Sequence, residues 1–423
     1  MTAERIAVVG AGISGIVAAH YLARMHRVVL FEAENRLGGH TNTIEIGDGF
    51  GPDKGLPVDT GFIVFNDQTY PSFIRFLSDL GLQGAPTDMS FSYSDPSRKL
   101  AYAGTGLTGL FARRRQAISP GYWAFLASVL RFNRRALADL TSSHLEALTL
   151  ERYLESIKAP KRLRRDYLGP MIQAIWSASE AEAMGYPAAS FIRFFHNHGL
   201  LSLPGKVRWR YLEGGSRTYL RAFQEAFPGE IRLKTPVSDV QRSPAGPLVR
   251  FHGGEERFDK VVLAAHADQT LDVLHDADEQ ERAALAPWRY AKNRTALHCD
   301  PAHMPSERKA WACWNVLGGN GGQGSRPVQV TYWMNRLQRF RASRDWLVSL
   351  NAETGFAPGS KVYETVYEHP VYSLESLAAQ KLLPAISGRR GTFFCGSYHG
   401  HGFHEDGARS ALDVVQNHFG VRL

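Results

Sequence analysis

Cysteine is scarce in this chain of 423 residues. The three cysteines are Cys299, Cys313 and Cys395, and no two of them form a Cys-x-x-Cys pair. This pattern excludes a disulfide scaffold, a zinc ribbon and a cysteine-bound iron–sulfur cluster, and it is typical of a reducing compartment. With 44% hydrophobic residues the chain is globular. Its length predicts about two domains, or one large α/β body with insertions.

Long apolar runs are also missing. No stretch reaches the roughly 18 apolar residues that a membrane-spanning helix needs. The first residues, MTAERIAVVGAG, lack the basic region and the apolar core of a signal peptide. We therefore expect a cytoplasmic protein that is either free in solution or bound to the inner face of a membrane.

Positive charge is unevenly distributed along the chain. The net charge is +8, and three basic clusters, at 113–115, 131–135 and 158–165, fall within the region 110–165. Between them lies the apolar, aromatic segment 121–132. Arginines beside such a segment are typical of a peripheral contact with anionic lipid, and the alternative is a solvated helical face. No recognised nucleic-acid-binding module accompanies the charge, so we expect no nucleic-acid partner.

The N-terminal segment has the pattern of a dinucleotide-binding unit. Residues 6–9 and 28–31 are short apolar runs typical of buried parallel strands, and residues 16–24 continue as an apolar helix. The motif GxGxxG stands at the turn between the first strand and the helix. An acid follows the last glycine of the motif by 17 residues (32 minus 15). This context makes the motif far more specific than its glycines alone.

Each residue of this motif has a physical task. Gly10 allows a tight turn, Gly12 lets the backbone approach a pyrophosphate, and Gly15 lets helix and strand pack closely. The helix N-terminus at Ser14 supplies N–H groups and the positive end of the helix dipole. Glu32, at the end of the second strand, accepts hydrogen bonds from ribose hydroxyls. The segment therefore predicts a bound dinucleotide.

The next residues, EAENRLGGHTNT (32–43), indicate FAD rather than NAD. They resemble the ExxxRxGG continuation of the flavin amine oxidase superfamily, which also holds phytoene desaturases and protoporphyrinogen oxidases. The resemblance implies that Arg36, Gly38, Gly39 and His40 lie along the FAD; a surface turn is the alternative. The cysteine–tyrosine motif of covalently flavinylated members is absent, so we expect non-covalent FAD.

Other segments match the same superfamily. PVDTGFIVFN (57–66) implies a strand and turn near the flavin ring, with Asp59, Thr60 and Gly61. Val237 is expected at the adenine end, and FDKVVLAAHAD (258–268) reads as a buried strand that ends over the cofactor at Ala264. The segment YLGPMIQAIWSAS (167–179) resembles a wall of the substrate cavity, with a buried helix as the alternative.

We expect an α/β fold: a Rossmann-like FAD-binding domain of the amine oxidase type with an inserted α+β substrate domain. The FAD-binding domain comprises residues 1–68, 205–289 and 385–423. The substrate domain comprises 69–204, where helical stretches predominate, and 290–384, where β-branched and aromatic runs indicate a sheet. A strand pair is expected at 231–242.

The segment CGSYHGHGFHEDGARSAL (395–412) crowds glycines and histidines ahead of a helix. It resembles the last motif of the superfamily, in which that helix points its N-terminus at the flavin. The resemblance places Gly396 and Ser397 near the pyrophosphate and ribityl chain. It places Gly402, Phe403 and His404 near the ring.

Histidines of this segment and of FFHNHGLL (194–201) are candidate catalytic residues. His399 and His401, like His196 and His198, have His-x-His spacing, which on a strand would suit a metal. No matching carboxylate or cysteine ligands appear, so we expect no metal. We expect histidines that donate hydrogen bonds or accept a proton. His399 and His401 are the first candidates for the base, and His198 is the next.

The whole chain resembles one branch of the superfamily, bacterial FAD-binding proteins with GGHxNT, PVDTGFIVFN, DMSFS and GFHEDG. The branch implies a lipid methyltransferase of the cyclopropane-fatty-acid-synthase type as a possible partner, and fatty-acyl desaturation on the route to furan fatty acids. Amine oxidases flank the flavin with two tyrosines, and Phe403 stands at the second of these positions.

The sequence therefore predicts an FAD-dependent desaturase or oxidase. It would remove a hydride and a proton from a methylated or unsaturated fatty-acyl chain, as part of a membrane phospholipid. One alternative is an amine or carotenoid-type oxidoreductase on the same fold. The other is a non-catalytic flavoprotein that assists a lipid methyltransferase.

Overall fold

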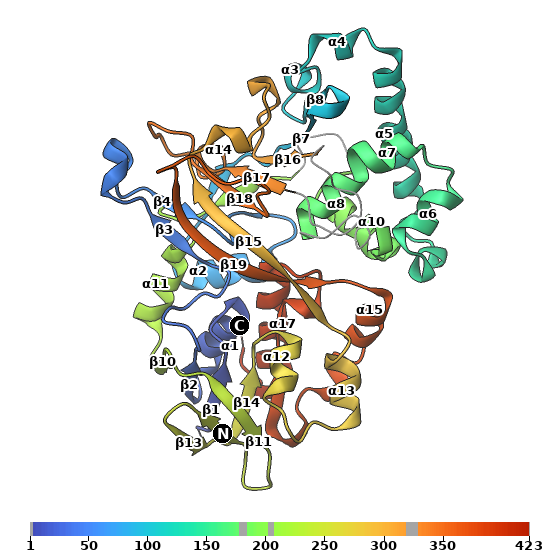
Figure 1. Cartoon of the computed structure of the whole chain (residues 1–423). Coiled ribbons are helices and arrows are strands. Elements are labelled where there is room, and N and C mark those ends of the chain that lie inside the picture. Colours follow the sequence, from blue (N-terminus) through green and yellow to red (C-terminus); the bar gives the residue numbers. More distant parts are fainter. Residues whose placement is uncertain (1–2, 177–183, 202–206, 319–328, 423) are drawn as a thin grey trace.

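The computed structural model describes residues 3–176, 184–201, 207–318 and 329–422. A lower body surrounds a parallel sheet, and an upper body combines a second, larger sheet with a group of helices (Figure 1). Segments from the start, the middle and the end of the chain meet in the lower body. This arrangement brings motifs that are far apart in sequence into one place.

The lower body is built on a five-stranded parallel sheet. The strands in spatial order are β10 (Glu230–Arg232), β2 (Arg27–Phe31), β1 (Arg5–Val9), β14 (Lys260–Leu263) and β20 (Thr392–Phe394). The central strands are continuous apolar runs because helices and loops cover both faces of the sheet. The expected strands at 6–9, 28–31 and 258–268 are confirmed. So is the α/β fold class with its Rossmann-like unit.

Four helices share one apolar core with this sheet. They are α1 (Ile13–Leu22), α2 (Pro71–Asp79), α11 (Arg217–Ala226) and α17 (His404–Phe419). The helix α1 begins earlier than expected, because the chain becomes helical directly after Gly12. Phe73 and Phe76 of α2 pack in the core of the lower body, although the expected boundary assigns them to the substrate domain. The domain division itself stays a prediction.

The expected strand pair at 231–242 is wrong, because the two strands in this segment do not pair with each other. Residues 230–232 join the parallel sheet beside β2, whereas β11 (Val237–Gln241) pairs with β12 (Leu248–Phe251). With β13 (Gly254–Arg257) these two strands form a separate antiparallel sheet. Lys234, with φ of 52°, turns the chain between the two sheets, and sequence alternation does not reveal such a turn.

The upper body contains a seven-stranded mixed sheet. Its order is β19 (Lys361–Val371), β15 (Arg289–His298), β18 (Leu347–Leu350), β17 (Gln329–Trp333), β16 (Trp314–Leu317), β7 (Phe91–Asp95) and β8 (Leu100–Ala103). Neighbours are antiparallel except β16 and β7. The β-branched and aromatic runs that predict sheet in this part of the chain contain β17 and β19.

Helices fill the other side of the upper body. They are α3 (Leu107–Leu110), α4 (Arg114–Ala117), α5 (Pro120–Asp139), α6 (Leu150–Ser156), α7 (Lys161–Leu163), α8 (Gly169–Trp176) and α10 (Ala188–Asn197). Figure 1 shows α3, α4 and α5 on the outside of the molecule, with α8 and α10 toward the centre. The inner helices belong to the same apolar cluster as one face of the parallel sheet.

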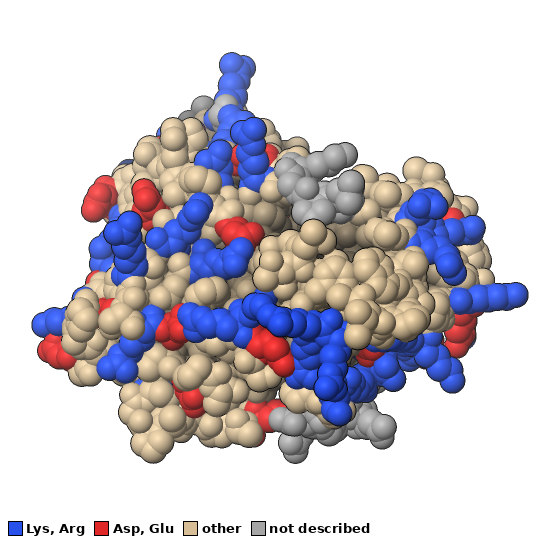
Figure 2. All heavy atoms as spheres, turned by 90° about the horizontal axis from the view of Figure 1, so that it is seen from above, with Lys and Arg blue, Asp and Glu red and all other residues tan. Residues whose placement is uncertain are grey.

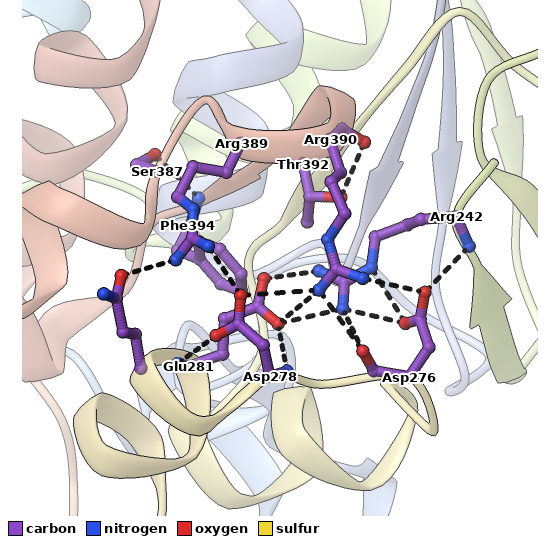
Figure 3. A network of polar contacts seen from close by, with 10 residues as sticks. Arg242, Asp276, Asp278, Glu281, Ser387, Arg389, Arg390, Thr392 and Phe394 are labelled. Carbon is purple, nitrogen blue, oxygen red and sulfur yellow. Dashed lines mark hydrogen bonds and ion pairs between the residues drawn. The ribbon is translucent and has the colours of Figure 1, made fainter. Parts of the chain in front are cut away.

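A buried ion-pair network fixes the start of β20 (Figure 3). The fully buried side chain of Arg242, just after β11, contacts Glu281 at 2.5 Å and Asp276 at 2.8 Å. Arg390, just before β20, contacts Glu281 at 2.9 Å. Glu281 lies on α13 (Glu279–Leu285). Each buried charge in this network has a partner of opposite sign, so no buried charge is left unpaired. The network therefore anchors the segment that leads into residues 395–403.

Candidate functional site

One large cavity, of about 1020 Å³, lies between the two bodies and collects most of the residues that the sequence singles out. Its cofactor part is lined by the glycine turns of the lower body, by the ends of β2 and β14, and by residues 396–398. Its aromatic part is lined by residues 62–64, 70, 89–91, 171, 175, 176, 194, 198, 200, 209, 314, 332 and 401–403. Further lining residues, at 265, 266, 269, 270, 272, 273, 292 and 365–370, belong to neither part and include Asp272, Lys292 and Glu368. The two parts differ sharply in chemistry.

The glycine turn at the start of α1 opens the cofactor part. Gly10 has φ of +98°, which favours glycine, and a Cβ on Gly15 would lie 1.8 Å from the carbonyl oxygen of Gly10. Gly15 therefore lies behind the turn and does not line the cavity. A Cβ on Gly12 would meet no atom within 4 Å, although Gly12 does line the cavity. The chain leaves open space at the place where a pyrophosphate would approach.

Two helix N-termini converge on this space. The helix α1 has no side-chain cap and no acid in its first turn, so its first N–H groups remain available to an anion. Gly407, in the first turn of α17, packs so closely against α1 that a Cβ there would lie 2.8 Å from Ile13 and Ser14 side-chain atoms. The N-terminal ends of both helices therefore lie in one region, although α17, unlike α1, carries the acids Glu405 and Asp406 in its first turn.

Glu32 is held in position at the end of β2. Its carboxylate accepts hydrogen bonds from the backbone N–H groups of Ala11 at 2.8 Å and Glu34 at 2.9 Å. A carboxylate has about four lone-pair sites, so Glu32 can still accept from two ribose hydroxyls. Arg36, from the same loop, donates to the carbonyl of Thr41 at 3.0 Å and also lines the cavity.

The structure brings most predicted cofactor residues together. Those that line the cavity are Gly10, Gly12, Ser14, Glu32, Arg36, Gly38, Gly39, His40, Gly61, Val237, Ala264, Gly396, Ser397, Gly402, Phe403 and His404. Thr60 does not line it and bonds instead to the Tyr367 hydroxyl at 2.8 Å. Asp59 is also outside the lining. Its buried carboxylate accepts a hydrogen bond from the backbone N–H of Ser216 at 2.9 Å. Burial raises the pKa of Asp59 to about 6.

Two histidines that the sequence analysis did not single out also line the cavity. His266 follows β14 and His369 lies on β19; their rings lie 6.2 Å and 5.3 Å from that of His40. Burial lowers the pKa of His40 and of His266 to about 4, and that of His369 to about 3, so all three are neutral near pH 7. The Nε2 atom of His40 is buried and has no partner among the described residues. A bound cofactor would satisfy it.

His266 directly follows Ala265 at the end of β14, so its position could have been read from the sequence. His369 could not, because only the path of β19 brings it to the cavity. Among the described residues, no three histidine, cysteine, aspartate or glutamate side chains are arranged to hold a metal.

Aromatic rings form a connected wall in the other part of the cavity. The ring of Phe194 lies 4.8 Å from Trp176, 5.0 Å from Phe403 and 3.8 Å from His198. Met171, Ile175 and Trp176 also line it, so the segment predicted as a cavity wall does reach the cavity; its residues 177–179 lie outside the described ranges. Among the described residues that line the aromatic part, none is Asp, Glu, Lys or Arg.

Of the three candidate bases, His198 and His401 line the cavity and His399 does not. Burial lowers the pKa of His198 to about 4 and lowers that of His401. The Nδ1 atom of His198 lies 2.9 Å from the carbonyl oxygen of Phe194. Since that oxygen can only accept, Nδ1 carries the proton and Nε2 keeps a free lone pair. His399 is enclosed beside Tyr398, and its Nε2 has no partner among the described residues.

A second, more polar hollow, of about 650 Å³, adjoins the aromatic part. The two share Tyr70, His198, His401 and Phe403. The remaining lining of the second hollow includes His196, Asn197, Glu405, Asp406 and Arg409. His198 and His401 therefore stand between an apolar space and a polar one.

Comparisons with known proteins agree with this geometry. The model of the family "Flavin containing amine oxidoreductase" matches residues 13–334. A candidate flavin-containing monoamine oxidase of Mycobacterium tuberculosis is 24% identical over 270 residues, covering 61% of this chain and 56% of that protein. A carotenoid phi-ring synthase of Streptomyces griseus is 28% identical over 291 residues, covering 62% and 52%. The chain matches only about half the length of these curated relatives.

Solved structures share the fold over nearly the whole chain. A fatty acid isomerase from P. acnes that produces CLA superposes with a TM-score of 0.70 at 14% identity, covering 98% of this chain and 99% of that one. The cyclohexylamine oxidase of Brevibacterium oxydans superposes with a TM-score of 0.68 at 15% identity, with the same coverage. At such identities the likeness concerns the fold alone.

Proposed function

The chain belongs to the flavin-containing amine oxidoreductase family, and on that premise we propose that it is an FAD-dependent oxidoreductase that desaturates or oxidises a fatty-acyl chain. The cofactor is FAD, which when bound supplies a two-electron acceptor for a hydride. The observation that carries the proposal is the lining of the aromatic part, where the described residues include no carboxylate and no cation.

The substrate class follows from the cost of burying charge. An amine substrate is a cation near neutral pH, and a cation moved into an apolar space needs a partner or must lose its proton. An acyl chain needs neither, because its burial is favourable by about 0.8 kcal/mol for each CH₂. Phe194, Trp176 and Met171 offer the kind of surface that such a chain requires.

His198 is the proposed base. Its Nε2 lone pair is free, and burial keeps the imidazole neutral by lowering its pKa to about 4. It would take a proton from the carbon next to the one that loses the hydride. His401 lies close by, and the polar hollow behind both histidines offers a route by which the proton can leave. This order of candidates differs from the sequence expectation, because His399 does not reach the cavity.

Residues of the lower body would hold the cofactor. The N–H groups at the start of α1 would bind the pyrophosphate and Glu32 the ribose. The N-terminal turn of α17 would stabilise negative charge that develops on the flavin ring. None of the three cysteines lines the cavity, which supports non-covalent binding. Acid treatment should then release free FAD from the denatured chain.

A polyene is the second candidate substrate. The carotenoid synthase is among the relatives, and a carotenoid would use the same apolar lining. The preference for a methylated or unsaturated acyl chain in a membrane phospholipid, and for a methyltransferase partner, comes from the resemblance to the bacterial branch and stays a prediction.

Product analysis tests the proposal. The purified holoprotein is incubated in air with membrane phospholipids, and the fatty acids are then released and weighed by mass spectrometry. We expect acyl products lighter by two hydrogens, formed about 10²–10⁴-fold more slowly by the His198→Gln variant. Unchanged lipids together with oxidised amines would assign the chain to amine oxidation. Unchanged lipids with tight lipid binding would favour the accessory flavoprotein.

A further inference from the structure

The outer face of α5 exposes three large apolar side chains in one line. Trp123 is 53% exposed, Leu130 59% and Leu137 38%. They are seven residues apart, so on a helix with 3.6 residues per turn they point to nearly the same side. The opposite side of α5 is packed, with Phe132 buried against Phe191 of α10 at a ring distance of 6.4 Å. An apolar line on the solvent side is not what core packing requires.

This face continues onto α3 and α4. Leu107 is 75% exposed and Ile118 is 82% exposed. Trp123 joins the segments, because its Nε1 donates to the carbonyl of Ala117 at 2.8 Å and its ring lies 5.3 Å from Phe111. Of the ten exposed large apolar side chains in the described chain, five belong to residues 107–137. We call the surface formed by Leu107, Ile118, Trp123, Leu130 and Leu137 the apolar face.

Unpaired arginines border the apolar face. Arg114, Arg115, Arg131 and Arg134 are exposed, and none has an ion-pair partner among the described residues. Arg134 lies four residues after Leu130 and three before Leu137, hence on the same stripe. Figure 2, which looks onto the end of the molecule that carries α3 and α4, shows Lys and Arg gathering there.

Other basic residues of this region have acidic partners. Arg113 pairs with Glu307 at 2.5 Å, and Arg135 pairs with Asp139 at 2.8 Å. In the cluster at 158–165, Arg162 and Arg165 share the buried Asp166, which also pairs with Arg98, so this one carboxylate offsets only part of their charge. Arg152, Lys158 and Lys161 are also exposed without an ion-pair partner among the described residues, so free positive charge borders the apolar face but is not confined to it.

We propose that the apolar face docks on an anionic phospholipid bilayer. Leucine, isoleucine and tryptophan side chains would enter the boundary between headgroups and acyl chains, and the four arginines would contact phosphates. The described helices include none with the length and apolarity to cross a bilayer, so the contact is peripheral. A nucleic acid would use the arginines but leave the aligned Trp123, Leu130 and Leu137 in water.

The apolar face lies on the outer side of the helices of the upper body. The inner side of the same helices lines the aromatic part of the cavity. Phe132 of α5 contacts Phe191 of α10, and α10 also carries Phe194, which lines the cavity. Docking by this face would hold the cavity near the acyl chains of the membrane. The proposal concerns binding alone and does not depend on which substrate is oxidised.

Vesicle sedimentation of the holoprotein tests the proposal. The probes are phosphatidylcholine vesicles with and without phosphatidylglycerol. The charge variant is Arg131→Glu/Arg134→Glu, and its control is Arg221→Glu/Arg282→Glu, two exposed arginines of the lower body that have no ion-pair partner among the described residues. Each basic residue near an anionic surface contributes about fivefold to binding. We therefore expect the charge variant to bind anionic vesicles at least 25-fold more weakly, by roughly fivefold for each lost arginine, and the control to bind as the wild type does.

The apolar contribution is tested separately. The variant Trp123→Gln/Leu130→Gln/Leu137→Gln should lose binding to anionic vesicles, whereas Leu374→Gln/Leu382→Gln, at two exposed leucines elsewhere, should not. Unchanged flavin absorbance and melting temperature show that each variant is folded. Equal vesicle binding by the wild type and either face variant would overturn the proposal. So would a dimer that dissociates in the apolar variant while no form binds vesicles, because the face would then belong to a second copy of the chain.

Discussion

The two parts of the cavity present opposite chemistry within one continuous space. The cofactor part consists of backbone turns, two helix N-termini and the fixed carboxylate of Glu32. The aromatic part consists of side chains, and among the described ones that line it none is charged. The first part recognises a ligand by hydrogen bonds and dipoles, and the second by contact and exclusion of water. Loss of a single polar group should therefore weaken cofactor binding strongly in the first part, whereas a single substitution in the second part should have a smaller effect on the rate.

The largest expected effect concerns Glu32. Replacing it with alanine removes the acceptor for two ribose hydroxyls, and such charge-assisted bonds contribute roughly 1.5–3 kcal/mol each. The Glu32→Ala variant should lose most of its FAD on gel filtration, whereas Glu255→Ala, an exposed ion-pair residue of the same body, should keep it. Measured flavin per chain decides the point. Equal retention by both variants would remove Glu32 from the site.

Replacing the proposed base should have an effect of similar size on the rate but not on cofactor binding. A positioned base contributes typically 10²–10⁴-fold, so His198→Gln should reduce the rate constant of anaerobic flavin reduction by about that factor while flavin content stays normal. The same change at His399, which does not line the cavity, should have a much smaller effect. The opposite order would restore His399 as the base.

The pH profile sharpens this prediction. The base acts when deprotonated, and burial lowers the pKa of His198 to about 4. The imidazole therefore stays neutral well below the pH at which an ordinary histidine protonates. The acid limb of kcat/KM for an uncharged acyl substrate should lie near pH 4, at the pKa of His198. A limb near 6.5, the ordinary value, would mean that the base is more exposed to water than His198 is.

Two glycines, one inside and one outside the cavity, allow a matched comparison of alanine substitutions. A Cβ would meet no protein atom at Gly12 or at Gly47, but only Gly12 lines the cavity. Gly12→Ala should keep its melting temperature without cofactor and weaken FAD binding by about 1–3 kcal/mol, the usual cost of an extra methyl in a packed contact. Gly47→Ala should change neither quantity. Calorimetry of the apoprotein with FAD measures both effects.

The smallest expected effect comes from charge in the aromatic part. Ile175 lines this part, and Ile175→Glu should lower kcat/KM for an acyl substrate about tenfold, which corresponds to about 1.4 kcal/mol. Ile175→Gln has nearly the same shape without the charge and should cost less. An increase in turnover of a cationic amine by the Glu variant would show that the missing carboxylate sets the substrate class.

The same contrast explains what the sequence could predict. The cofactor part depends on short contiguous motifs, such as GxGxxG and the loop at 396–404, where backbone geometry fixes residue type and spacing. Asp59, Thr60 and His399 are expected near the flavin but lie outside the cavity lining, whereas Gly15 packs behind the turn as expected. Motif position alone cannot distinguish a supporting residue from one that faces the ligand.

The aromatic part could be predicted only in fragments. It combines segments that are up to 341 residues apart in sequence (403 minus 62). From the sequence, apolar residues of this kind cannot be distinguished from residues of the hydrophobic core. The surface charges illustrate the same limit. The sequence shows that region 110–165 is basic, but only the fold reveals that Arg113 has an acidic partner and that Arg134 has none among the described residues.

The most direct test of the central claim is the anaerobic reduction of bound FAD by two substrates in turn. The oxidised holoprotein is mixed without oxygen with membrane phospholipids carrying unsaturated or methylated acyl chains, and separately with primary amines. The account predicts that the lipid bleaches the oxidised-flavin absorbance and that the amines do not. Bleaching by an amine, with no response to any lipid, would contradict it.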